Sequence, residues 1–341
     1  MFKYILYAGI FSMYVQVVAK TVLVTGGAGF IGSHVCEKLL QRGDEVIIID
    51  NLNNAYDPEI KKQNLFEIKK SDLNNKLTIY IEDICNEKEI KNIFAKHKID
   101  TLCHLAARAG VRPSIDDPIE YIKTNLIGTV TLFEEAKNYK INNIVFASSS
   151  SVYGERKNEQ KFLESDVTDQ QSSPYGMTKK AGELLAHMYF HLYNIPITCL
   201  RFFTVYGPRA RRDMAPYIFM HAIYNNNPIS IFGNGNALRD FTYIDDIVNG
   251  IIKAIDTPLD FEILNLGRGQ PITVLELISV LEKIIGKKAQ VVFEESILGD
   301  VSTTHASIIK AKKLLSYEPM YSIKEGIREM FNWYLKEQEK N

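Results

Sequence analysis

TVLVTGGAGFIG, the stretch Thr21–Gly32, decides the fold. It starts as an apolar, β-branched run, breaks into closely spaced glycines and continues in a helical pattern. A strand, a glycine turn and a helix in this order are the context that a dinucleotide-binding fingerprint requires. Gly26 can take the tight turn, Gly29 lets the backbone approach a pyrophosphate, and Gly32 allows the helix to pack closely on the strand. The N-terminus of this helix then offers unpaired N–H groups to the phosphates.

An acid at the expected distance accompanies this fingerprint. Asp50 ends a second apolar run, Val46–Ile49, near the offset of ~20 residues at which a ribose-binding carboxylate is expected. A carboxylate there accepts hydrogen bonds from both ribose hydroxyls and repels a 2′-phosphate, and no arginine follows it closely. The pattern therefore predicts NAD and not NADP. The alternative is a glycine-rich turn without a ligand, which the acid at the end of the second strand disfavours.

Composition narrows the class of protein. The 341 residues suffice for one large α/β domain and a smaller one. Basic and acidic residues nearly cancel (40 against 41) and form no long block of one sign, so nothing in the sequence indicates a nucleic acid partner. The four cysteines are scattered without a C-x-x-C pair, which indicates reduced core thiols and neither disulfides nor a zinc site.

Residues 1–19 form an apolar N-terminal segment with three possible roles. The run follows Lys3 and ends in Val17-Val18-Ala19, which resembles a signal-peptide cleavage site. It is short for a membrane span, which needs ~20 apolar residues. A signal, a membrane anchor and an upstream extension all stay open. The NAD fingerprint and the free thiols favour a cytoplasmic catalytic domain, with or without membrane attachment through this segment.

Strands and helices alternate after Asp50, which predicts the fold class. Further strands are expected at 77–81, 101–105 and 144–147, and helices at 61–70 and 119–137. This order is typical of an α/β protein with a doubly wound parallel (Rossmann) sheet, whose ligand crevice lies at the carboxyl ends of the strands. We expect an NAD-binding domain over 20–204. Shorter elements follow, as in a smaller C-terminal α/β substrate domain over 205–341, partly interleaved with the first.

Residues at the strand ends are the further candidates for cofactor binding. Asp83 follows a strand and could meet the adenine amino group or cap the next helix, and the sequence leaves both open. Ala106 and Ala107 are small enough for the backbone to lie against a dinucleotide. His104, inside an apolar strand, is expected to be a core residue.

The chemistry is expected from Ser149, at a strand end, and from Tyr175 and Lys179, four residues apart on one helical face. A phenol with a pKa near ~10 is a poor base at neutral pH, but a nearby ammonium and the positive nicotinamide ring can lower that pKa. Tyr175 could then accept a proton from a sugar hydroxyl while a hydride leaves the same carbon. Ser149 could bond to the same oxygen. A Y-x-x-x-K pair alone is weak evidence for a catalytic site. In a chain that also carries the glycine fingerprint, it is strong evidence.

These motifs together resemble the extended short-chain dehydrogenase/reductases that act on nucleotide sugars, most closely the UDP-glucuronate 4-epimerase branch. The resemblance rests on TGGAGFIG, SSSSVYG, SPYGMTK, RFFTVYGPRAR, RDFTYIDD and LGDV, which cover nearly the whole chain after residue 20. It implies that Ser149, Tyr175 and Lys179 are the catalytic triad. It also implies a homodimer packed through helices near Ile119–Lys137 and Tyr175–Tyr193. The tightly bound NAD would be held by Gly26, Gly29, Phe30, Ile31, Gly32, Asp50, Asn51, Asp83, Ile84, Leu105, Ala106, Ala107, Asn125, Tyr175 and Lys179.

The serine-rich strand end selects among the reactions of that family. A dehydratase or a UDP-glucuronate decarboxylase resembles this chain but places a carboxylate beside the catalytic serine, whereas this chain has Ser149-Ser150-Ser151-Val152-Tyr153. Without a positioned carboxylate, a 4-keto sugar has no obvious route to elimination and can only take hydride back on its other face. The sequence therefore favours a UDP-sugar 4-epimerase. A UDP-glucuronate decarboxylase and a catalytically silent NAD-binding protein remain as alternatives.

A uronate substrate would need an anchor for its carboxylate. Ser150, Ser151 and Thr204 offer hydroxyls, and Arg211 offers a charge that suits a bidentate contact. The alternative for Arg211 is a solvated loop or a diphosphate contact, and a neutral UDP-hexose or UDP-N-acetylhexosamine would need no such charge. The resemblance places Arg239 on the UDP diphosphate and Asp300 near the nucleotide. Asp245-Asp246 is expected to cap a helix and not to bind a metal.

Overall fold

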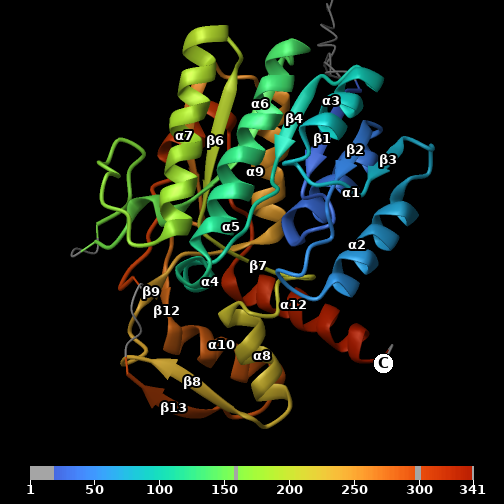
Figure 1. Ribbon diagram of the computed structural model, residues 1–341. Coiled ribbons are helices and arrows are strands. Elements are labelled where there is room, and N and C mark those ends of the chain that lie inside the picture. The colour runs from blue at the N-terminus through green and yellow to red at the C-terminus, as the bar shows by residue number, and fades with distance from the viewer. Residues whose placement is uncertain (1–18, 157–159, 296–300, 340–341) are drawn as a thin grey trace, which may run out of the picture.

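The computed structural model describes residues 19–156, 160–295 and 301–339, and its centre is one parallel sheet of seven strands (Figure 1). The spatial order is β11-β6-β5-β4-β1-β2-β3, and every neighbouring pair is parallel. The order reverses between β1 and β4, so the sheet is doubly wound, as the sequence predicts. The strands are β1 (Thr21–Thr25), β2 (Glu45–Ile49), β3 (Leu77–Tyr80), β4 (Thr101–His104), β5 (Asn143–Ser149), β6 (Ile197–Phe202) and β11 (Phe261–Leu266).

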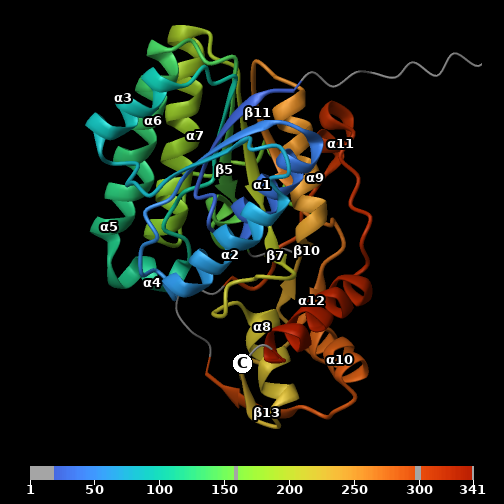
Figure 2. The same cartoon turned by 90° about the vertical axis from the view of Figure 1, so that its right-hand side faces the viewer.

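Helices cover both faces of this sheet (Figure 2). Because successive strand residues point to opposite faces, Val22 and Val24 join one core cluster and Leu23 joins the other. The first cluster packs against α1 (Phe30–Arg42), α2 (Pro58–Ser71) and α9 (Ile244–Asp256). The second packs against α3 (Glu87–Lys96), α6 (Gly128–Asn138) and α7 (Pro174–Tyr193). Because the strands are buried on both faces, their sequences are continuous hydrophobic runs.

The helix ends follow from local sequence signals. Helix α1 stops at Gly43, which takes the left-handed conformation at φ 91° that glycine adopts readily. Helix α7 starts with Ser173 as N-cap, whose hydroxyl accepts from the Gly176 N–H, and with Pro174 in its first turn. The capping therefore fixes where the Tyr175–Lys179 face begins.

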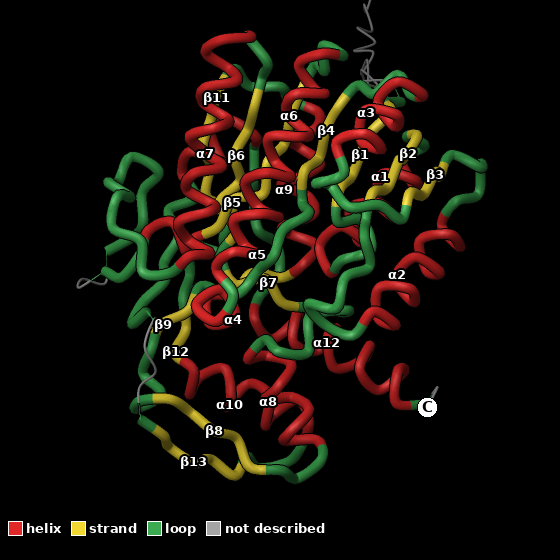
Figure 3. Tube along the Cα trace, in the orientation of Figure 1, coloured by secondary structure: helices red, strands yellow, loops and turns green. Residues whose placement is uncertain are grey.

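A smaller group of elements lies below the sheet in Figure 1. Its main parts are α8 (Ala215–Tyr224), α10 (Val274–Ile285), α12 (Ile323–Gln338) and the parallel pair β8 (Pro228–Phe232) and β13 (Gln290–Glu294). Loops and short elements fill the region between the two groups (Figure 3). These short elements are α4 (Val111–Asp116), η2 (Ser150–Tyr153), β7 (Thr204–Tyr206), β9 (Leu238–Arg239), β10 (Phe241–Tyr243) and β12 (Ile272–Thr273). Helix α11 (Ile309–Leu315) packs against β11 and α9.

The chain passes between the two groups more than once. After β8 and β10, it returns to the large sheet with α9 and β11. The division into 20–204 and 205–341 remains a prediction, and residues 244–266 are where any such division is interleaved.

Two sequence expectations differ from the structure, and one alternative that the sequence left open is decided. The single helix expected over 119–137 is α5 (Pro118–Ile122), a π-helical turn η1 (Lys123–Ile127) and then α6. Asp245 and Asp246 do not cap α9, whose N-cap is Tyr243; that expectation is wrong because the Asp246 carboxylate accepts from the N–H groups of Met320 and Tyr321 across the packed loop. Asp83 does not cap α3, whose N-cap is Asn86.

The expectations for the N-terminal segment, residues 1–19, fall almost wholly outside the described residues. Among the described residues, no helix has both the length and the apolar character that a membrane crossing requires.

Candidate active site

A cleft of about 450 Å³ lies at the carboxyl ends of the strands, and the glycine turn forms one wall of it. Gly26 has φ 71° and its N–H donates to the carbonyl oxygen of Ile49 at 2.8 Å, which joins the turn to β2. A Cβ atom on Gly32 would lie 2.2 Å from the carbonyl oxygen of Gly26, so only glycine allows this close packing. The predicted roles of Gly26 and Gly32 therefore have a steric basis.

The residues of this wall fit a dinucleotide. Helix α1 has Gly29 as its N-cap, without a side-chain cap and without an acid in its first turn. Its first N–H groups have no partners within the helix and suit phosphate oxygens. Asp50 lies at the end of β2 with its carboxylate accepting from the N–H groups of Ala28 and Leu52, at 3.1 and 2.9 Å. Burial raises the pKa of Asp50, whereas the Lys61 ammonium opposes that rise.

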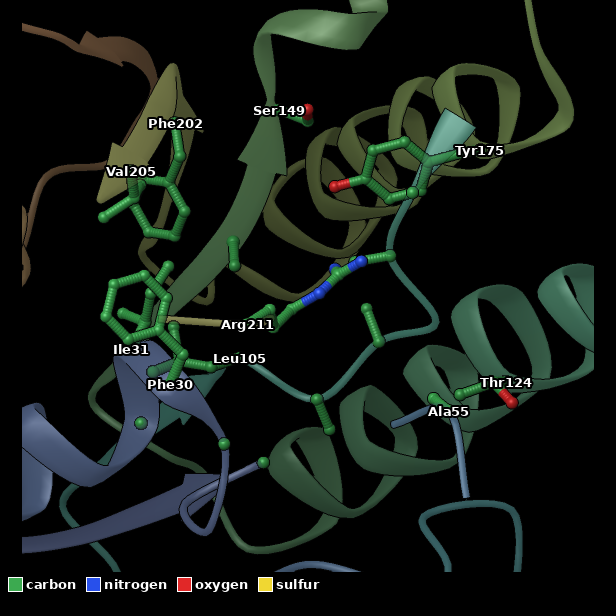
Figure 4. Close-up of a pocket in the computed structure, with 18 of the residues that line it drawn as sticks. Phe30, Ile31, Ala55, Leu105, Thr124, Ser149, Tyr175, Phe202, Val205 and Arg211 are labelled. Atoms are coloured by element: carbon green, nitrogen blue, oxygen red, sulfur yellow. The ribbon is translucent and has the colours of Figure 1, made fainter. Parts of the chain in front are cut away.

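Ser149, Tyr175 and Lys179 all line the same cleft, and Figure 4 shows the side chains of Ser149 and Tyr175 beside it. Ser149 is the last residue of β5, and the other two lie in the first turns of α7. The Lys179 ammonium donates to the carbonyl oxygen of Ala147 at 2.7 Å. The N–H of Tyr175 donates to the hydroxyl of Ser114 in α4 at 3.1 Å, a support that the sequence did not reveal.

The electrostatics of Tyr175 differ from the expectation. Burial raises the pKa of Tyr175, while a hydrogen bond with Ser149 and the charge of Arg211 oppose the rise. Burial also lowers the pKa of Lys179 to about 7. The expected fall in the Tyr175 pKa is therefore wrong for the protein on its own, because removing a phenolate from water costs more than these two neighbours return.

The candidate residues for a substrate carboxylate all belong to the cleft lining. Ser150, Ser151, Thr204 and Arg211 all line it, together with Tyr175. The Arg211 guanidinium forms a two-point ion pair with Asp213, with Nε to Oδ1 at 3.0 Å and Nη2 to Oδ2 at 2.5 Å. In Figure 4 the guanidinium extends into the cleft below the Tyr175 ring.

Most of the predicted cofactor residues line the cleft. These are Gly26, Gly29, Phe30, Ile31, Gly32, Asp50, Asn51, Ile84, Leu105, Ala106, Ala107, Tyr175 and Lys179. Asp83 lies behind this wall, where its carboxylate accepts from the side chain of Asn51 at 2.8 Å. Its predicted contact with adenine stays a prediction. Asp300 lies outside the described residues, and Arg239 is not among the cleft residues.

Asn125 supports the cleft from behind and does not line it. Its side chain donates to the Arg108 carbonyl oxygen and to the Thr178 hydroxyl, both at 3.0 Å, and accepts from the Arg108 N–H at 2.8 Å. It lies in the π-helical turn η1, and such turns are frequent at functional sites. Asn125 thus ties the loop after β4 to the helix that carries Tyr175.

Several cleft residues were not predicted from the sequence. Tyr56 and Lys61 reach it from the loop after β2 and from α2, and Met214 reaches it from the loop before α8. The polar loop after Asp50 was a signal for the first two, but spacing alone did not show which side chains turn inward. His104 is a buried core residue, as predicted, held between the hydroxyls of Thr25 and Thr129. Within the described ranges, no group of acidic, histidine or cysteine side chains could hold a metal ion.

A dinucleotide cleft with serine, tyrosine and lysine at its rim defines a short-chain dehydrogenase/reductase. The family model described as the NAD dependent epimerase/dehydratase family matches residues 22–267, and the chain belongs to that family. A curated relative, the UDP-glucuronate 4-epimerase of Thermodesulfobacterium geofontis, is 46% identical over 312 residues, which are 91% of this chain and 95% of the relative.

Two solved structures match this chain in fold, and each is named with a bound UDP-sugar. The UDP-glucuronic acid 4-epimerase of Bacillus cereus, solved with UDP-glucuronic acid and NAD, matches with a TM-score of 0.86 and 37% identity, over 93% of this chain and 99% of that one. The UDP-glucose 4-epimerase of Thermotoga maritima, solved with UDP-glucose, matches with a TM-score of 0.85 and 32% identity, with the same coverage.

Proposed function

We propose that this protein is an NAD-dependent UDP-sugar 4-epimerase that interconverts UDP-glucuronate and UDP-galacturonate through a transient 4-keto sugar. The observation that carries the proposal is that Tyr175 and Arg211 line one cleft, beside a strand end that bears only serines. The T. geofontis and B. cereus relatives support the same substrate.

Tyr175 would act on the C4 hydroxyl of the sugar. NAD, when bound, supplies the hydride acceptor and donor for C4. The phenol oxygen accepts the C4 hydroxyl proton during oxidation and returns it during reduction, a form of general base and acid catalysis. Ser149 bonds to Tyr175 and is placed to hold the same sugar oxygen. Because burial raises the Tyr175 pKa, the reaction depends on the opposing positive charge of Arg211 and on the hydrogen bond with Ser149.

Among the described cleft residues, the absence of acids beside Ser149 and Tyr175 favours epimerisation over loss of water or CO₂. Among the described residues that line the cleft, the carboxylates are Asp50 and Glu82, which follow β2 and β3 at the far side from Ser149. The 4-keto sugar therefore meets no acid–base pair that could promote elimination. Ser150, Ser151 and Thr204 offer hydrogen bonds to the uronate carboxylate, which hold it without protonating it.

Arg211 gives the proposed preference for a uronate. Its guanidinium already holds one carboxylate, that of Asp213, in a two-point ion pair. A planar guanidinium matches a carboxylate in this geometry, so the substrate can compete for the same group. The second candidate is a neutral UDP-hexose 4-epimerase, which the T. maritima UDP-glucose 4-epimerase supports at 32% identity.

The first experiment is to incubate the purified protein with UDP-glucuronate without added NAD and to follow the sugar by NMR. We expect UDP-galacturonate to appear until the two reach a constant ratio. A pentose product with CO₂ would identify a decarboxylase. Turnover of UDP-glucose or UDP-N-acetylglucosamine alone would remove the uronate preference, and no turnover of any of them would support a silent NAD-binding protein.

We also propose a homodimer packed through α5 and α7. These helices pack side by side and expose apolar side chains, among them Ile119 and Leu184, which are 78% and 61% exposed. Met188 and Leu192 continue the α7 row at spacings of four residues, which places them on one face. Exposed apolar patches of this kind mark protein interfaces. A self-complementary pair of helices from each subunit would bury them.

A further inference from the structure

The hydroxyl of Tyr56 is buried in the cleft without a hydrogen-bond partner among the described residues. Buried polar groups are almost always paired, since an unpaired one costs ~1–3 kcal/mol. An unpaired hydroxyl that faces a cleft therefore indicates a partner that enters the cleft.

The position of this hydroxyl identifies the part of the cleft concerned. A Cβ atom on Gly29 would lie 3.8 Å from the Tyr56 oxygen, so the phenol stands over the glycine that caps α1. The unpaired N–H groups of the α1 N-terminus follow this same glycine. Tyr56 and this helix end therefore bracket one position.

The surrounding loop holds Tyr56 in place. The ammonium of Lys61 donates to the backbone oxygen and to the side-chain oxygen of Asn53, both at 3.0 Å. The same ammonium lies 4.9 Å from the centre of the Tyr56 ring, a cation–π contact. The ring that carries the hydroxyl is thus held by the loop around it.

The chemistry of the phenol selects the partner. Burial, helped by the charge of Asp50, raises the pKa of Tyr56, so the hydroxyl stays protonated and acts as a donor. Phosphate oxygens at neutral pH are acceptors and carry negative charge, which suits a helix N-terminus on one side and a donor on the other.

We propose that the Tyr56 hydroxyl donates a hydrogen bond to the pyrophosphate of the bound dinucleotide, opposite the N-terminus of α1, and thereby slows release of the cofactor. The inference rests on NAD as the cofactor but not on the sugar or on epimerisation. A protein that binds NAD and fails to epimerise UDP-glucuronate would refute the proposed function and leave this inference standing.

The test is the exchange of bound NAD for radiolabelled NAD in the purified protein, with the wild type compared with Tyr56→Phe. Phenylalanine keeps the ring over Lys61 and removes only the donor. We expect exchange to be roughly 10-fold faster, the effect of losing one hydrogen bond to a charged group. We also expect less NAD in the protein as isolated, measured by chromatography of the nucleotide released on denaturation.

Tyr80→Phe is the matched control. It removes a hydroxyl that bonds to His97 at 2.8 Å and does not line the cleft. Its exchange rate should match that of the wild type. Unchanged exchange in Tyr56→Phe would overturn the proposal. A higher KM for the UDP-sugar with unchanged NAD exchange would overturn it as well, because the hydroxyl would then serve the substrate diphosphate.

Discussion

The ammonium of Lys179 bonds to the carbonyl oxygen of Ala147 at 2.7 Å, so the second turn of α7 is fastened to strand β5 near its carboxyl end. Ser149 follows Ala147 by two residues on the strand, and Tyr175 precedes Lys179 by one helical turn. One hydrogen bond therefore aligns the two elements that carry the serine and the tyrosine. Lys179 has a positioning part in the site in addition to its charge.

Replacing Tyr175 with phenylalanine should remove turnover and keep the cofactor. Loss of the general base costs on the order of 10²–10⁴-fold in rate. The measurement is kcat with UDP-glucuronate, together with NAD content and melting temperature. If Tyr175→Phe kept wild-type turnover, another residue would have to move the C4 proton.

Replacing Arg211 with methionine should separate the two substrate classes. We expect the KM for UDP-glucuronate to rise by roughly 10- to 100-fold, because a charge-assisted contact is lost, and the KM for UDP-glucose to change little. Arg212→Met is the control, since this neighbour is exposed and is not among the cleft residues. An equal rise in KM for both sugars would instead place Arg211 on the shared diphosphate, whereas an equal fall in kcat alone would reflect its charge beside Tyr175.

The buried pair of Glu183 and Arg201 should be sensitive to loss of one partner. Arg201 donates to both oxygens of Glu183, at 2.8 and 2.9 Å, and Ser148 donates to the same carboxylate at 2.6 Å. Glu183→Gln leaves a buried guanidinium without its counter-charge, so the free energy of unfolding should fall by about 3–5 kcal/mol. Urea denaturation measures it.

Glu67→Gln provides the comparison for that experiment. Glu67 pairs with Lys70 on the surface of α2, at 3.0 Å. Because exposed pairs contribute little, its loss should change stability by less than about 1 kcal/mol. Similar losses of unfolding free energy in the two variants would show that the buried pair contributes no more to stability than the surface pair.

Acid should destabilise the protein through its buried histidines. Burial lowers the pKa of His104 to about 3 from an ordinary 6.5. Between these values the unfolded chain binds a proton that the folded chain does not, so stability falls as the pH drops below 6.5. The contribution approaches about 1.4 kcal/mol per pH unit. His104→Asn should be less stable at pH 7 but should lose less stability between pH 6 and pH 5 than the wild type does.

A charge on α7 should dissociate the proposed dimer. Leu184→Glu places a carboxylate in the exposed apolar face of that helix, where a partner subunit would have to bury it. Light scattering after size exclusion should show monomers for this variant and dimers for the wild type. Leu73→Glu, at another exposed leucine outside these helices, should remain dimeric. A monomeric wild type would refute the interface.

The sequence was informative where chemistry depends on local order. The glycine turn, Asp50 and the Tyr175–Lys179 face each lie within one strand–turn–helix unit, and the structure places all of them at the cleft. Apolar runs likewise predicted the parallel sheet, since its strands are buried on both faces.

Contacts between distant segments could not be predicted in the same way. The burial that raises the Tyr175 pKa and the inward turn of Tyr56 depend on packing across the cleft. The π-helical turn at Lys123–Ile127 was missed because its residues fit the pattern of an ordinary helix. Asp246 resembled a cap, but its hydrogen-bond partners lie at residues 320 and 321.

The place of β11 at one end of the sheet also has a consequence for biosynthesis. Its partner β6 ends at Phe202, but β11 begins only at Phe261. The ribosome must therefore make residues 203–260 before β11 can pair with β6. Until then the nascent chain presents an open strand edge, which invites pairing with other chains. A gene fragment that stops near residue 204 should therefore yield aggregates rather than an isolated nucleotide-binding module.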